Sequence, residues 1–159
     1  MPIEVDRVET VTVDSYGTLV DPRAADRALA ARVDDPEPIS RLWRSRSLAY
    51  TMVGNFVGFY QPFYEMNRDA LSFALAAHGV DLPPDEVEEI LSAYLDLDAF
   101  DDVRPGIERI RDAGYAVWVV SNGDPQMLDA MVEHAGLSEL VAGTVSADEV
   151  RTFKPHPRI

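Results

Sequence analysis

A carboxylate stands at the end of a predicted strand near the beginning of the chain. Residues 8–13 alternate β-branched Val and Thr over most of their length, which predicts a strand, and the run breaks at Asp14 into the loop sequence Ser-Tyr-Gly-Thr. In open parallel α/β sheets, ligands bind beyond the carboxyl ends of the strands, so Asp14 is a candidate catalytic group. Asp followed by Ser and Gly is also ordinary turn chemistry, and this stretch alone leaves both interpretations open.

Two further polar sites follow predicted elements of the same core. Ser121 and Asn122 come directly after residues 115–120, a continuous apolar run typical of a strand buried on both faces of a parallel sheet. Lys154 lies beyond a short strand predicted at residues 144–145. Because parallel strands end at one rim of the sheet, we expect these groups to converge on one ligand with the carboxylate described above. A simple turn, whose Asp caps the next helix, is the alternative for the first of the two sites.

The surrounding elements predict an α/β protein with a helical insertion. Residues 22–97 lose strand character and predict an all-helical cap, with Ser40 as the N-cap of its second helix. The helices of this cap are expected, between proline-containing breaks, at residues 23–33, 41–59, 67–77 and 84–94. Helices and strands alternate again afterwards, so residues 1–21 and 98–159 predict a Rossmann-like parallel sheet core with the cap inserted after its first strand.

The composition limits the kinds of partner. The chain has 159 residues, 47% hydrophobic content and a formal net charge of −14, so it can bury a core and will repel nucleic-acid phosphates and anionic membranes. Thirteen Arg but a single Lys, in an acidic chain, suggest adaptation to high cytoplasmic salt. There is no Cys and the three His are scattered, so no metal or cofactor is expected. The sequence shows no leader and no membrane-spanning pattern, which predicts a cytoplasmic protein.

Six stretches of the sequence carry recognisable motifs, namely V-D-S-Y-G-T-L-V-D at 13–21, L-W-R-S-R-S-L-A-Y-T at 42–51, D-A-L-S-F at 69–73, S-N-G-D-P-Q at 121–126, H-A-G-L at 134–137 and F-K-P at 153–155. Together they resemble the haloacid dehalogenase superfamily and, within it, the (S)-2-haloacid dehalogenases. These stretches follow the family's order and spacing through the whole chain. The resemblance implies hydrolytic dehalogenation of short (S)-2-haloalkanoic acids to (R)-2-hydroxy acids, with a small 2-haloacid and water as substrates and no cofactor.

The resemblance also implies roles for the matched residues of the reaction centre. Asp14 would attack C2 of the substrate and form an ester, with Lys154 holding its carboxylate ionised and Thr18 holding its loop. Arg44, from the cap, would draw off the halide with help from Asn122. Without the resemblance, Arg44 is an ordinary exposed residue of a helix.

A substrate pocket is implied by the same resemblance. Ser121 and the backbone of Ser15 and Tyr16 would bind the substrate carboxylate, while Leu48 and Phe63 would form apolar walls. The phosphatases of the superfamily carry a second Asp where this chain has Tyr16. A halide leaves without a proton, so Tyr16 favours a dehalogenase over the alternative of a phosphatase acting on a small phosphoester.

The family's pattern continues well past Lys154, through further strands and a fourth motif. The resemblance therefore implies that the chain matches the N-terminal two-thirds of such an enzyme, with the strand at 8–13 left at a sheet edge. On this interpretation, the alternatives to a dehalogenase that completes the reaction are an inactive fragment, whose ester forms but is not hydrolysed, and a noncatalytic remnant. A homodimer formed through the cap is a further family expectation.

Overall fold

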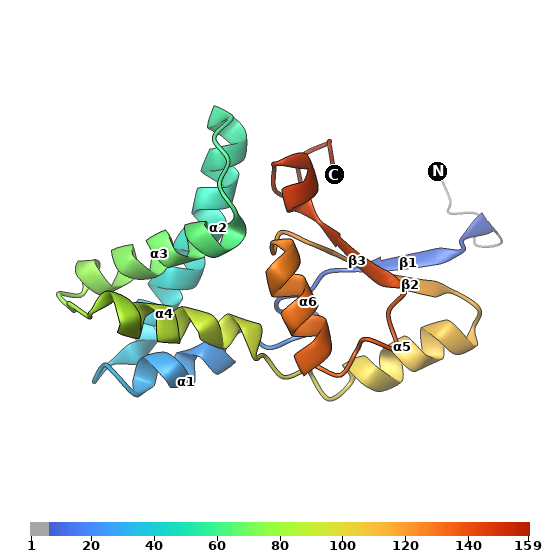
Figure 1. Cartoon of the computed structure of the whole chain (residues 1–159), viewed down its shortest axis with the longest axis horizontal. Helices are drawn as coiled ribbons and strands as arrows, with labels where there is room; N and C mark the ends of the chain where they lie inside the picture. Colours follow the sequence, from blue (N-terminus) through green and yellow to red (C-terminus); the bar gives the residue numbers. More distant parts are fainter. Residues whose placement is uncertain (1–6) are drawn as a thin grey trace.

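The computed structural model describes residues 7–159, and the first six residues of the predicted core lie outside it. Helices and strands alternate on either side of a helical insertion (Figure 1). In chain order the elements are β1 (Thr10–Val13), α1 (Ala24–Ala30), α2 (Pro36–Val57), α3 (Phe63–Ala77), α4 (Pro84–Ser92), the 3₁₀ turn η2 (Ala93–Leu95), α5 (Val103–Asp112), β2 (Ala116–Ser121), α6 (Pro125–His134), β3 (Gly143–Ser146) and the 3₁₀ turn η3 (Ala147–Val150). Across residues 7–159, none of the helices is both long and apolar enough to cross a bilayer.

The sheet has the order β1-β2-β3, and both pairs of neighbouring strands are parallel, as predicted. The register pairs Val13 of β1 with Val119 of β2, and Val119 with Thr144 of β3. β2 is central, and its buried Val117 and Val119 share one face, whereas the opposite face, with Ala116, Trp118 and Val120, is only partly buried, so the prediction of a strand buried on both faces holds for one face alone. β1 lies at one edge of the described sheet, as expected. All three strands run the same way, so their carboxyl ends share one rim.

Helices α1 to α4 form the predicted cap between β1 and α5, beside the sheet (Figure 1). The long helix α2 packs against α3, and the cap interior includes the fully buried Trp43, Leu71 and Ile90. Trp43 donates from Nε1 to the backbone oxygen of Asn67 at 2.9 Å, so its one polar group is satisfied inside the cap. Burial of these apolar side chains stabilises the four helices as one packed unit.

The structure corrects the predicted start of the second cap helix. The sequence predicts Ser40 as an N-cap, but α2 begins at Pro36, and its N-cap residue Asp35 makes no side-chain cap hydrogen bond. Prolines are tolerated there because the N–H groups of a first helical turn have no intrahelical partner and the fixed φ of proline suits a helix. Ser40 lies inside α2, 1% exposed, where its hydroxyl donates to Asp26 Oδ1 of α1.

Candidate active site

Asp14 and Lys154 form an ion pair at the rim of the sheet. Asp14 is the first residue after β1, and Lys154 lies in the loop after η3. Lys154 Nζ donates to Asp14 Oδ1 at 2.6 Å and to the backbone oxygen of Val120 in β2 at 2.5 Å. The Asp14 and Lys154 side chains are 45% and 29% exposed, so a small reactant can reach the carboxylate. The ammonium therefore orients the carboxylate without covering it.

The loop after Asp14 is closed by its own backbone. The carbonyl oxygen of Ser15 accepts from the N–H groups of residues 18–20, and Gly17 takes a left-handed φ of 84°, which suits a residue without a side chain. Thr18 takes part through its backbone N–H, 3.2 Å from Ser15 O, while the residue itself is exposed. This tight turn holds Asp14 directly beyond the end of β1.

Ser121 joins the ends of β1 and β2 inside the protein. Its hydroxyl lies 2.5 Å from the hydroxyl of Ser15 and also accepts from the N–H of Gly123 at 3.0 Å. Both serines are buried. Buried hydroxyl groups need hydrogen-bond partners, and these two serines satisfy each other. Their hydrogen bond links the ends of β1 and β2.

Asn122 connects the loop after β2 to the loop that carries Lys154. Its Oδ1 accepts from the backbone N–H of Lys154 at 2.6 Å. Asp14, Lys154 and Asn122 therefore form one connected set of hydrogen bonds, although Asp14 and Lys154 are 140 positions apart. The three polar sites that follow the predicted strands converge in the structure.

Tyr16 packs its ring against two other aromatic residues. The ring centroid is 5.9 Å from that of Tyr94 and 6.4 Å from that of Phe63. A Cβ added to Gly123 would come within 3.0 Å of the Tyr16 ring, so the close packing depends on glycine. Burial raises the pKa of the Tyr16 phenol well above its usual value, with a smaller effect from nearby Asp124. The phenol is therefore neutral, and no atom of residues 7–159 hydrogen-bonds to its hydroxyl.

The cap brings Phe63 to this aromatic cluster and holds Arg44 in a network of its own. Arg44 Nη1 donates to the two carboxylate oxygens of Asp26 at 2.7 and 3.0 Å, and to Ser40 Oγ at 2.5 Å. The Arg44 and Asp26 side chains are about one-third exposed. Leu48, further along α2, is 62% exposed. These hydrogen bonds of Arg44 thus stay within the cap, and Leu48 faces solvent.

Asp124 connects the cap to the core at the start of α6. Its Oδ1 accepts from the Met127 N–H at 3.2 Å, and its Oδ2 accepts from the Tyr64 N–H at 3.3 Å. The capping role that the sequence allows for Asp124 is therefore confirmed. Because Tyr64 lies in the first turn of α3, one carboxylate bonds to the N-terminal N–H groups of two helices.

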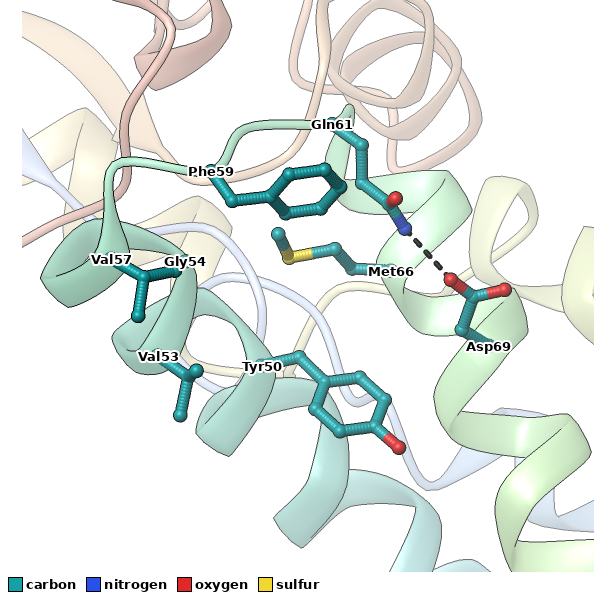
Figure 2. A pocket seen from close by; sticks show the side chains of 8 residues that line it. All are labelled: Tyr50, Val53, Gly54, Val57, Phe59, Gln61, Met66 and Asp69. Atoms are coloured by element: carbon teal, nitrogen blue, oxygen red, sulfur yellow. Dashed lines mark hydrogen bonds between the residues drawn. The ribbon is translucent and has the colours of Figure 1, made fainter.

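A cavity of about 220 Å³ lies within the cap (Figure 2), and neither Asp14 nor Lys154 lines it. At one side Gln61 Nε2 donates to Asp69 Oδ2 at 2.9 Å. The cavity is lined mainly by apolar side chains of α2, α3 and the segment between them, namely Tyr50, Val53, Gly54, Val57, Phe59, Gln61, Met66 and Asp69. The exposed rim, not this cavity, therefore holds the candidate chemistry. Over the described range 7–159, no three His, Asp or Glu side chains gather closely enough to hold a metal ion.

Sequence reasoning missed two polar residues with several partners, Asp26 and Asn55. Asp26 binds Arg44 from another helix, and nothing in the sequence of α1 marks it. Asn55 hydrogen-bonds to residues 152–153, near the far end of the chain. Its one available signal is its place in the apolar stretch M-V-G-N-F-V, where a single amide stands among apolar side chains.

The protein thus has an α/β core with a helical cap, and its candidate reaction centre is an Asp–Lys pair at the rim of the sheet. The family model of haloacid dehalogenase-like hydrolases matches residues 8–159, and the chain belongs to this family. The resemblance drawn from the sequence motifs is thereby confirmed.

Characterised relatives narrow the comparison. The (S)-2-haloacid dehalogenase 4A of Burkholderia cepacia is 33% identical over 156 residues, which are 98% of this chain and 68% of that protein. The solved structure of the L-2-haloacid dehalogenase from Xanthobacter autotrophicus has a TM-score of 0.88 at 31% identity and covers 94% of this chain. A structure of that enzyme with chloropropionic acid covalently bound has a TM-score of 0.87, at 31% identity and 94% coverage of this chain. The chain spans 61% of the Xanthobacter structures.

Proposed function

We propose that the rim dehalogenates short (S)-2-haloalkanoic acids, with Asp14 as the nucleophile. A carboxylate oxygen of Asp14 attacks C2, a C–O bond forms as the C–halogen bond breaks, and the halide leaves with the bonding electron pair. Attack opposite the leaving group inverts C2. Water then adds to the ester carbonyl, and cleavage between that carbon and the substrate oxygen releases an (R)-2-hydroxy acid and a proton and restores Asp14.

The contact between Lys154 and Asp14 is the observation that supports this proposal most directly. The hydrogen bond of 2.6 Å fixes the direction of one carboxylate oxygen, and the opposite charges attract each other at a partly exposed rim. Tyr16, a neutral buried phenol, stands where a phosphatase would need an acid, and a halide leaves without a proton. The Xanthobacter structure with chloropropionic acid covalently bound is consistent with the same chemistry.

The substrate carboxylate is assigned to the turn after β1. The backbone of Ser15 and Tyr16 would bind it, with Ser121 behind them, since the Ser121 hydroxyl is bonded to Ser15 and supports this turn from the end of β2. Thr18 would support the turn through its backbone hydrogen bond. Carboxylate recognition by backbone N–H groups in a tight turn is a common arrangement for anions.

The halide is assigned to the side that faces the cap. Asn122 Oδ1 already accepts from Lys154, so its Nδ2 donor is the part that an anion would meet. Arg44 would supply the positive charge, and Phe63 and Leu48 would flank a substrate with a short alkyl chain. Arg44 would contact the halide through a guanidinium nitrogen other than Nη1, because Nη1 is hydrogen-bonded to Asp26.

Reaction with (S)-2-chloropropionate tests the proposal. We expect free chloride and an ester that joins the Asp14 carboxylate to C2 of the propionate, detected by ion assay and by mass spectrometry of the peptide that contains Asp14. The Asp14→Ala variant and the (R) enantiomer are the controls, and neither should give the ester. One equivalent of chloride with a persistent ester would support the nucleophile and place the block at ester hydrolysis. Folded protein that yields neither ester nor chloride would overturn the proposal.

A further inference from the structure

Asn55 of α2 is hydrogen-bonded to the loop that carries Lys154. Its Oδ1 accepts from the Phe153 N–H at 2.9 Å and from Thr152 Oγ1 at 2.7 Å, and its Nδ2 donates to Phe153 O at 2.6 Å. One amide therefore pairs with both backbone polar groups of Phe153. Thr152 and Phe153 are 3% and 1% exposed, so losing this amide would leave the Phe153 N–H and the Thr152 hydroxyl without their partner, while the Phe153 carbonyl would keep its hydrogen bond from the His156 N–H.

The loop enters this contact from an unfavourable turn. Arg151, at the end of η3, has a φ of 50°, a left-handed conformation that costs energy in a residue with a side chain. Its guanidinium lies over the Tyr60 ring, 5.2 Å from the centroid, and the Tyr60 ring is 5.3 Å from that of Phe153. Tyr60 follows α2 in the chain. The end of α2 and the segment after it therefore support the loop at several points, which offset the strain at Arg151.

We propose that Asn55 is a positioning residue for Lys154, through which the cap controls the contact between Lys154 and Asp14. Phe153 directly precedes Lys154, and because Asn55 holds both its N–H and its carbonyl, the cap fixes the chain on one side of Lys154 while Asn122 of the core holds the Lys154 N–H. A displaced backbone would lengthen the 2.6 Å contact with Asp14. The effect on reactivity rests on the proposed function, because misplacement by about 1 Å can cost about 100-fold in rate.

Lys154 is the only Lys of the chain, so its side chain can be observed without ambiguity. Protein grown with ¹³C-labelled lysine should give one set of Cε–Hε signals, and acylation of its amine by a succinimidyl ester can be followed on the peptide that contains it. In the unaltered protein, we expect slow acylation and two distinct Hε shifts, because Nζ is held by Asp14 and Val120. In Asn55→Ala, we expect the Hε shifts to converge and acylation to rise about fivefold, the factor for one lost net hydrogen bond.

Two further variants separate positioning from a general effect on α2. Phe56→Ala is the matched control, because Phe56 is the next residue of the same helix, is 92% exposed and receives the same new side chain. It should behave as the unaltered protein. Asn55→Asp keeps an acceptor for Phe153 and Thr152 but loses the donor, so we expect a release of Lys154 between those of the unaltered protein and Asn55→Ala. If Asn55→Ala does not fold, Asn55→Asp tests the positioning role in its place.

The outcomes distinguish this inference from the proposed function. In the unaltered protein and Phe56→Ala, ester formation on Asp14 should have the same maximal rate, whereas Asn55→Ala should lower that rate about 10-fold or more without raising the half-saturating substrate concentration. Lys154 signals and acylation that stay unchanged in both Asn55 variants, in folded protein, would overturn the positioning role. An equal effect of Phe56→Ala would also overturn it. Release of Lys154 in a protein that forms no ester would retain the positioning role and reject the proposed function.

Discussion

The ammonium of Lys154 lies 2.6 Å from the carboxylate of Asp14, across 140 positions of the chain. With side chains 29% and 45% exposed, such a pair contributes only about 0–1 kcal/mol to the free energy of unfolding. Stability is therefore a weak reason for this contact. Its geometry, with the second bond of 2.5 Å to Val120 O, suits a compact ammonium better than a planar guanidinium.

Replacing Lys154 by Met should therefore separate reactivity from stability. We expect ester formation on Asp14 to slow by about 100-fold or more, because the orienting charge is lost. The free energy of unfolding should change by about 1 kcal/mol or less. Rapid-quench mass spectrometry and urea denaturation measure the two quantities. Lys154→Arg keeps the charge but not the shape, and we expect it to resemble Lys154→Met; a Met variant as reactive as the unaltered protein would contradict the assignment.

Arg44 can be compared with Arg46 on the same helix. Arg44 is held by Asp26, whereas the Arg46 guanidinium lies over the Phe73 ring, 4.4 Å from its centroid. Arg44→Gln should lower the rate of ester formation about 10-fold or more, because it removes the charge that the proposed function assigns to the departing halide. Arg46→Gln makes the same chemical change and should leave the rate within about twofold, since it changes only the distant field. Single-turnover chloride release measures both, and equal losses would mean that net charge alone matters.

The parts of the fold that depend on local pattern could be predicted from the sequence. The apolar run at residues 115–120 predicts a strand, and β2 forms there, although only the face with Val117 and Val119 is fully buried and the opposite face is partly buried. The convergence of Asp14, Asn122 and Lys154 follows from the same inference, because parallel strands end at one rim. These predictions needed no knowledge of distant side-chain pairs.

The start of α2 and the partners of Asn55 and Arg44 could not be predicted, because they depend on contacts that a local sequence pattern does not indicate. Ser40 fits an N-cap by residue type, but Pro36 begins the helix earlier because a first turn tolerates proline. The amide of Asn55 meets Phe153 from 98 positions away, and Arg44 meets Asp26 from another helix. Partners of this kind are set by how the cap packs, which the sequence alone does not specify.

The buried phenol of Tyr16 should make stability depend on pH in the alkaline range. Burial raises its pKa above the usual 10.0, so the neutral form is favoured in the folded protein. The unfolded chain ionises first, and this contribution is present below pH 10 and lost as pH rises beyond it. Burial also raises the pKa values of Tyr60, Tyr64 and Tyr94, so the phenols act in the same direction.

The Tyr16→Phe variant measures how much the Tyr16 phenol contributes to this alkaline pH dependence of the free energy of unfolding. The hydroxyl has no hydrogen-bond partner within residues 7–159, so near neutral pH its removal should leave the free energy of unfolding unchanged or raise it by about 1 kcal/mol. Between about pH 10 and pH 11, the variant should lose stability less steeply than the unaltered protein. Urea denaturation across this range measures both slopes, and identical slopes would contradict the raised pKa.

Gly54 lets the turn after α2 approach the helix closely. A Cβ at Gly54 would lie 2.8 Å from the backbone oxygen of Phe59 and 3.0 Å from the terminal methyl of Met66. The methionine can move, but the carbonyl can move only with the turn, so Gly54→Ala should lower the free energy of unfolding by about 1–3 kcal/mol. Gly106→Ala in α5 is the matched control, because a Cβ there meets nothing within 4 Å. It should gain about 0.5–1 kcal/mol from helix propensity.

The Gly54→Ala substitution should also affect the candidate active site through the adjacent Asn55. Gly54 directly precedes Asn55, and its Cβ would also lie 3.9 Å from the Phe153 ring, in ordinary contact. A turn displaced by Gly54→Ala should loosen the amide contact with Phe153 and speed acylation of Lys154, whereas Gly106→Ala should leave acylation unchanged. Urea denaturation and peptide-level acylation of both variants measure the two effects. Gly54→Ala as stable as Gly106→Ala would show that the turn moves without cost, contrary to the close approach in the structure.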